Sequence, residues 1–165
     1  MDKNRNRLVL FVSLISFAIV SVCLMAMYFI ETNTNSPPSF TSILCGIAFW
    51  LFMIIGIVSQ ITVSMSVKSW CNKKKLYRSR FRRTKIGAIS FFSNLPSVIS
   101  DVTFIVSLIV FVIVLIIDST SVLAYIFLSV LFLSFCTHCI FNGKNYYYIK
   151  NYEQIKAQLI KMEEK

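Results

Sequence analysis

The stretch of sequence that decides the fold is residues 68–85, KSWCNKKKLYRSRFRRTK. It carries nine Lys or Arg residues and no acidic residue, and two long apolar runs lie on either side of it. Positively charged loops stay on the cytoplasmic side of a membrane, so this stretch predicts a cytoplasmic middle for the chain. That placement sets the direction of all four apolar runs.

The rest of the 165-residue chain has the composition of a membrane protein, with 56% apolar residues. These residues fall in runs of about twenty, which is the length that a helix needs to cross a hydrocarbon core. The predicted spans are about residues 8–30, 40–67, 96–117 and 122–141. The first run is longer than the apolar region of a signal peptide, and no small-residue cleavage site follows it, so we interpret it as a retained helix.

The distribution of charge predicts that both termini are cytoplasmic. In that topology all 17 Lys and Arg residues lie on the inner side, and the outer loops hold only Glu31 and Asp118. We therefore predict an all-α, multi-pass protein of the plasma (inner) membrane, built as a four-helix bundle of two antiparallel hairpins. Residues 1–143 form the membrane domain, with a basic cytoplasmic loop at 68–95. The abundance of Lys, Asn, Ile, Phe, Ser and Tyr is typical of an AT-rich bacterial genome.

Residues 144–165 form a separate, polar tail. Its apolar side chains recur at intervals of four and three residues, which predicts one cytoplasmic amphipathic helix. The residues of this face are Tyr148, Tyr152, Ile155, Leu159 and Met162. Such a face lies on the bilayer, docks on the membrane helices or pairs with a partner helix, and the sequence leaves these three arrangements open.

Several residues predict local features of the spans. Asn94 and Pro96 are typical of a helix start, and Asn142 followed by Gly143 predicts a left-handed cap at the end of the fourth span. Small residues gather on one face of the first span, at Ser13, Ser16 and Ser21. They predict close approach of another helix, or else hydroxyl groups that bond back to their own turn. Ser42 and Gly46 form a second, weaker small-residue pair.

Asp101 and His138 are the ionisable residues inside the predicted spans. Such groups are costly in a membrane and are candidates for function. The hairpin of the third and fourth spans brings both to similar depth near the cytoplasmic side, where Gln60 and Thr62 of the second span can join them. One interpretation is a polar vestibule open to the cytoplasm. The other is that the pair merely aligns two helices. No acidic residue falls at mid-membrane, which disfavours a proton-coupled pump.

Cys136 and Cys139 form a C-x-x-C pattern around His138. This spacing suits a thiol redox pair, but here it lies near the C-terminal end of a helix, where the helix dipole disfavours a thiolate. Cys136, His138 and Cys139 are also weak candidates for metal ligands, because the second pair of a zinc site is missing. Small cysteines that fill a helix interface are the simpler interpretation. The sequence predicts no cofactor.

The basic loop interleaves cations with Trp70, Tyr77 and Phe81, a pattern that suits single-stranded nucleic acid or a layer of lipid headgroups. Because the loop is tethered at the membrane, we favour anionic phospholipid headgroups over nucleic acid, with an acidic protein partner as a further option. The candidate lipid contacts are Lys73, Lys74, Lys75, Arg78, Arg80, Arg82, Arg83 and Lys85.

Three classes of function follow from these features. The sequence favours a small non-enzymatic membrane accessory (a subunit, regulator or immunity-type protein) that binds a membrane-protein partner and anionic lipid at the cytoplasmic face. The second class is a small transporter or channel, formed as a homo-oligomer around the polar vestibule. The third is a membrane thiol redox enzyme. No nucleotide-binding loop, metalloprotease motif or nucleophile motif is present to favour an enzyme.

Overall fold

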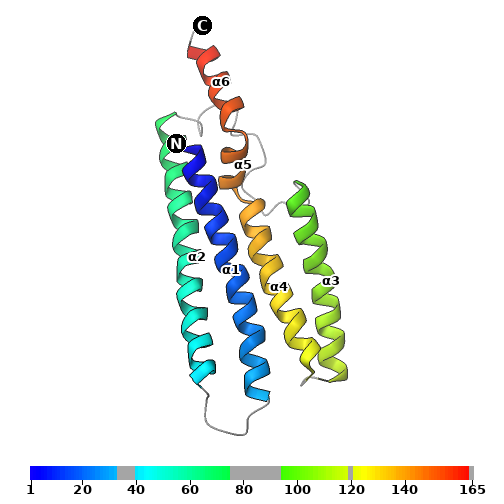
Figure 1. Cartoon of the computed structure of the whole chain (residues 1–165). Helices are drawn as coiled ribbons and strands as arrows, with labels where there is room; N and C mark the ends of the chain where they lie inside the picture. Colours follow the sequence, from blue (N-terminus) through cyan, green and yellow to red (C-terminus); the bar gives the residue numbers. More distant parts are fainter. Residues whose placement is uncertain (33–39, 75–93, 119–120, 164–165) are drawn as a thin grey trace.

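The structure, a computed structural model, describes residues 1–32, 40–74, 94–118 and 121–163, and these form six α-helices. They are α1 (Lys3–Thr32), α2 (Phe40–Lys73), α3 (Leu95–Ile117), α4 (Val122–Phe141), α5 (Lys144–Lys150) and α6 (Tyr152–Glu163) (Figure 1). The first four are long and apolar enough to cross a membrane. Over the described residues, the prediction of an all-helical fold with four helices long and apolar enough to cross a membrane is therefore confirmed. Residues 75–93, most of the basic loop, lie outside the described residues.

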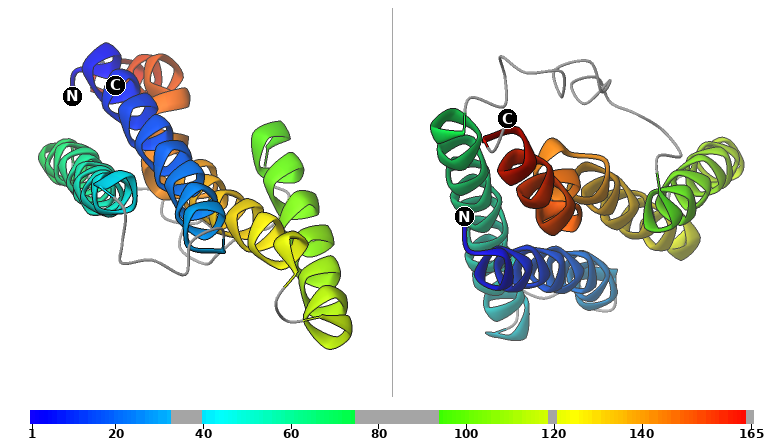
Figure 2. Two further views of the ribbon diagram at one scale, coloured as in Figure 1. Left: turned by 60° about the horizontal axis from the view of Figure 1, so that its bottom comes forward. Right: turned by 90° about the horizontal axis from the view of Figure 1, so that it is seen from above.

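The four apolar helices form a row. α1 packs on α2 and α4, and α3 packs on α4, so the order across the row is α2, α1, α4, α3 (Figure 2). The buried apolar core draws its side chains from α1, α2, α4, α5 and α6, and no described residue of α3 belongs to it. The four helices of the predicted bundle are therefore arranged as a row, with α3 outside the apolar core. The physical reason is that α3 turns its buried polar residues toward α4 and carries apolar residues elsewhere.

The small residues of α1 account for the close packing of α2 and α4 against it. Ser13 Oγ donates a hydrogen bond to Gly56 O of α2 (3.1 Å), and Ser21 Oγ donates to Ser129 O of α4 (2.7 Å). Ser16 Oγ instead donates to Val12 O in its own helix. Both interpretations from the sequence therefore hold, for different serines. Hydrogen bonds between helices matter here because burial of apolar surface does not drive helices together within lipid.

Gly56 lies at a close contact between α1 and α2. A Cβ atom at this position would lie 2.8 Å from Cε1 of Phe17, which is itself buried. At Gly46, in the pair that the sequence singled out, a Cβ atom would meet no atom within 4 Å. The close helix contact on α2 therefore depends on Gly56 and not on Gly46.

The tail consists of two helices, where the sequence predicted one. Asn151 leaves the helical conformation between α5 and α6, and its side-chain Nδ2 donates to Tyr147 O (3.0 Å). Asparagine side chains that bond to the backbone compete in this way with a continuing helix. The break lets Tyr148 and Tyr152 both pack on Trp70 of α2, with ring centroids 6.1 and 5.3 Å from it.

The two predicted caps have different outcomes. Asn94 caps α3 as expected, because its side chain accepts a hydrogen bond from the Ser97 backbone N–H. The left-handed cap after α4 is wrong. Asn142 is right-handed (φ −87°, ψ −9°) and Gly143 is extended (φ −70°, ψ 153°), since the chain enters α5 at once.

We predict that Gly56→Leu destabilises the protein by about 1–3 kcal/mol, the usual cost of overpacking a close contact. Gly46→Leu is the matched control, because it makes the same change in the same helix at an open position. The measurement is the free energy of unfolding in detergent or bicelles. Equal effects of the two substitutions would contradict the assignment of the close contact to Gly56.

Candidate functional site

The candidate site lies between the start of α3 and the end of α4. Asp101 comes six residues after Leu95, about 9 Å along the helix axis at 1.5 Å per residue. His138 comes three residues before Phe141. Asp101 is 1% exposed and His138 is 7% exposed, and Nδ1 of His138 contacts Oδ1 of Asp101. The pair expected from the sequence is therefore present.

Each member of the pair has a further partner one helical turn away. Ser97 Oγ donates to Oδ2 of Asp101 (3.1 Å), and Asn142 Nδ2 lies 2.8 Å from Nδ1 of His138. Residues four apart share a helix face, so each helix presents two polar side chains to the other. Both carboxylate oxygens of Asp101 thus have a partner, which offsets the cost of burying the group. Ser97 and Asn142 were not predicted as partners of the pair, although their four-residue spacing from it was a usable signal.

Asn94 joins the two helices at the edge of the site. Its Oδ1 accepts from the Ser97 backbone N–H (3.1 Å), and its Nδ2 donates to Phe141 O (3.0 Å). The last carbonyl groups of a helix have no partner in the helix itself, so this bond satisfies one end of α4 from the cap of α3. Polar contacts therefore continue from the cap of α3 through Asp101 and His138 to the end of α4. The main effect of this arrangement is to hold α3 against α4.

Gln60 and Thr62 are not part of this site. Gln60 Nε2 donates to Ser13 Oγ of α1 (2.9 Å), and Thr62 Oγ1 donates to Val58 O in its own helix (2.8 Å). Both residues lie on α2, and α1 and α4 separate α2 from α3 (Figure 2). Within one chain, Gln60 and Thr62 therefore do not join Asp101 and His138 as expected, because the helices form a row and not a ring.

The Asp101–His138 pair does not line the pocket that the described residues form between α3 and α4. This pocket has a volume of about 330 Å³. Its hydroxyl-bearing residues include Ser134 and Thr137, which donate to carbonyl groups of their own helix. A carboxylate beside an imidazole can hold and pass a proton. The surroundings of this pair favour a role in helix alignment.

The cysteine pattern does not assemble a metal site. All five cysteines are free, with Cys136 buried and Cys139 exposed. Within the described ranges, no group of three or more His, Cys, Asp or Glu residues is placed to hold a metal ion. Nδ1 of His138, the third weak candidate ligand, is occupied by Asp101.

Two of the eight candidate lipid-contacting residues lie within the described part of the chain. Lys73 ends α2 and Lys74 follows it, and both are exposed. They lie at the end of the molecule that also carries the N-terminus and the start of α3 (Figure 1). The other six, Lys75, Arg78, Arg80, Arg82, Arg83 and Lys85, fall outside the described residues.

We predict that Asp101 and His138 are energetically coupled. Asp101→Ala or His138→Ala alone leaves a buried polar group without its partner, which costs about 3–5 kcal/mol when a buried pair is broken. The double variant should cost less than the sum, by roughly 1–3 kcal/mol, in a double-mutant cycle of unfolding free energies.

Thr137→Ala provides the control for this cycle. Thr137 is the neighbour of His138 in the chain, but its hydroxyl group donates to Leu133 O of its own helix (2.7 Å). Asp101→Ala and Thr137→Ala should be additive within about 0.5 kcal/mol. Additivity of the Asp101 and His138 substitutions would overturn the coupling.

In comparisons with known proteins, no family model, no curated protein and no solved structure matches this chain.

Proposed function

We propose that the protein is a non-enzymatic accessory of a membrane-protein complex, held in the plasma membrane with both termini in the cytoplasm. In this topology α1 with α2 and α3 with α4 are two antiparallel hairpins, and all 17 Lys and Arg residues face the cytoplasm. The basic segment, with Lys73 and Lys74 at its start, then lies against anionic headgroups.

The observation that carries the proposal is the position of α3. Among the described residues, this helix packs mainly on α4, through a buried polar site, and most of the rest of its surface is apolar and exposed. Many of its exposed side chains are β-branched, such as Val102, Val106 and Ile113. β-Branched side chains have few rotamers and lose little entropy when a neighbour packs on them. We propose that a helix of the partner packs along this surface.

The row of helices also supports an accessory over a transporter. A path for an ion or substrate needs helices that enclose it, and the row has α2 at one edge and α3 at the other. A transporter would therefore require several copies of the chain. Among the described residues, the buried Asp101–His138 pair favours this second candidate. A thiol enzyme has less support, since one cysteine of its pair is buried.

We predict that a photoreactive side chain at Val106, which is 52% exposed on α3, crosslinks one membrane protein of defined mass in native membranes. The same group at Val22, which is 65% exposed on α1, is the control and should label lipid. Val106→Trp should abolish co-purification of that partner in mild detergent, and Val22→Trp should not. Crosslinks only to lipid at Val106 would overturn the proposal, and crosslinks only to a second copy of the chain would favour the transporter.

We further predict that the purified protein in liposomes conducts protons and potassium ions no faster than protein-free vesicles do. The measurement is the decay of an imposed gradient, followed with a pH-sensitive dye and a potassium electrode. Flux that is lost in Asp101→Asn would contradict the accessory role and establish the pair as part of a path. Asp101→Asn keeps the shape of the side chain, so such a loss would report on charge.

A further inference from the structure

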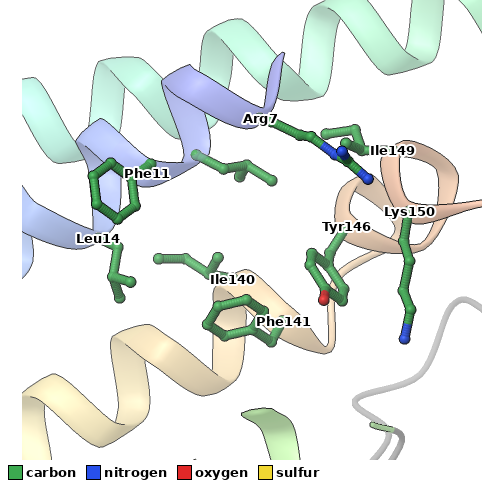
Figure 3. Close-up of a pocket in the computed structure, with 9 residues that line it drawn as sticks. Arg7, Phe11, Leu14, Ile140, Phe141, Tyr146, Ile149 and Lys150 are labelled. Atoms are coloured by element: carbon green, nitrogen blue, oxygen red, sulfur yellow. The ribbon is translucent and has the colours of Figure 1, made fainter. Parts of the chain in front are cut away.

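A pocket of about 280 Å³ lies between α1, α4 and α5 (Figure 3). Its walls are apolar and include Leu10, Leu14, Ile140 and Phe141. Arg7 and Lys150 line the same pocket, with Arg7 coming from α1 and Lys150 from α5 (Figure 3). The site therefore combines an apolar interior with two cations contributed by separate helices.

The two cations lack a carboxylate partner within the described part of the chain. No acidic residue lines the pocket, and Glu153 on the nearby α6 pairs with Lys3 instead (3.3 Å). Lys150 Nζ lies 6.0 Å from the ring centroid of Tyr146, another lining residue. Arg7 and Lys150 thus make the pocket positively charged, which favours an anionic ligand.

The position of Arg7 indicates where the pocket lies in the membrane. Arg7 is the last charged residue before the uncharged run at 8–30. Charged side chains at the ends of membrane helices lie at the headgroup level, so the pocket reaches from that level into the hydrocarbon region. Phe11, which lines it, is 62% exposed, so the pocket opens sideways toward the lipid.

The size of the pocket indicates a ligand that is only partly enclosed. Pockets that bury whole small molecules are usually about 300–1,000 Å³. At about 280 Å³ this pocket is at the lower end of that range, and its opening beside the exposed Phe11 suits one part of a longer molecule whose remainder stays in the bilayer. A phospholipid has this form, with an anionic phosphate above an extended apolar chain.

We propose that this pocket binds one anionic phospholipid of the leaflet that carries the N-terminus. The phosphate lies between Arg7 and Lys150, and one acyl chain runs along Leu14 and Phe141. This site rests on the proposed membrane function and adds a second lipid contact to the one proposed for the basic loop. Residues 75–93 cannot supply the anionic partner of Arg7 and Lys150 in place of a lipid, because they include no acidic residue.

The test is a titration of the purified, full-length protein in non-ionic detergent, read by native mass spectrometry. The three probes are phosphatidylglycerol, phosphatidylcholine and soluble glycerophosphoglycerol, which has the headgroup but no acyl chain. We expect one tightly held phosphatidylglycerol per chain, weaker binding of phosphatidylcholine and no retained glycerophosphoglycerol. Equal binding of the two lipids, or binding of the soluble headgroup alone, would overturn the proposal.

Matched variants locate the site. Arg7→Gln with Lys150→Gln should weaken phosphatidylglycerol binding roughly 25-fold, from about 1 kcal/mol for each cation near a lipid surface. Arg5→Gln with Lys156→Gln removes the same charge from exposed positions outside the pocket and should change binding less than threefold. Equal losses in the two double variants would overturn the proposal in favour of non-selective charge attraction.

A third variant tests the apolar part of the pocket with both cations in place. Leu14→Trp fills the space along α1 and should weaken phosphatidylglycerol binding at least tenfold; unchanged binding would overturn the assignment of the acyl chain. Helical circular dichroism and a single elution peak verify the fold of each variant.

The crosslink at Val106 reports on the partner independently of this titration. Non-selective lipid binding with that crosslink intact would reject the lipid site alone. Selective lipid binding without the crosslink would reject the accessory role alone.

Discussion

The hydrocarbon region of a membrane holds no water, so a polar group buried there must find its partner within the protein. This constraint accounts for the way α3 is attached. Asp101 would be costly on a helix by itself, but Ser97 and His138 satisfy its two oxygens. Asn94 adds a bond to the last turn of α4. Because these bonds are directional, they specify which face of α3 meets α4 and leave the other faces free to contact lipid or another protein.

The same constraint acts differently along α1. Here single hydroxyl groups donate to backbone carbonyls of neighbouring helices, from Ser13 to Gly56 and from Ser21 to Ser129. Small residues let the helix backbones come close enough for these bonds and for close van der Waals packing. Farther along the contact between α1 and α4, the rings of Tyr28 and Tyr125 stack with their centroids 3.7 Å apart. α1 therefore links α2 to α4, and α4 in turn carries α3, which produces a row of helices.

The two ends of the four long apolar helices differ in charge and in packing. At the end with the N-terminus, the tail helices cover Trp70 and place Lys150 near Arg7, so cations meet an apolar pocket. At the other end, the acidic residues Glu31 and Asp118 follow the spans. Both proposals use this asymmetry. The lipid site needs the cations at the headgroup level, and the partner surface needs α3 to remain uncovered along its length.

The sequence alone was sufficient for the number of long apolar helices, for their approximate limits and for the similar depth of Asp101 and His138, whereas their contact is seen only in the structure. These features depend on local composition and on short connections: an apolar run of about twenty residues is long enough to span a membrane, and only a few residues separate the third and fourth spans. Which helices share a face could not be read in this way. α2 and α3 carry apolar residues on all sides. Hydrophobic periodicity therefore did not distinguish the side that meets protein from the side that meets lipid. The separation of Gln60 from Asp101, the choice of Gly56 over Gly46 and the pocket beside Arg7 all depend on long-range packing. That packing is settled by a few hydrogen bonds and close contacts between helices far apart in the chain.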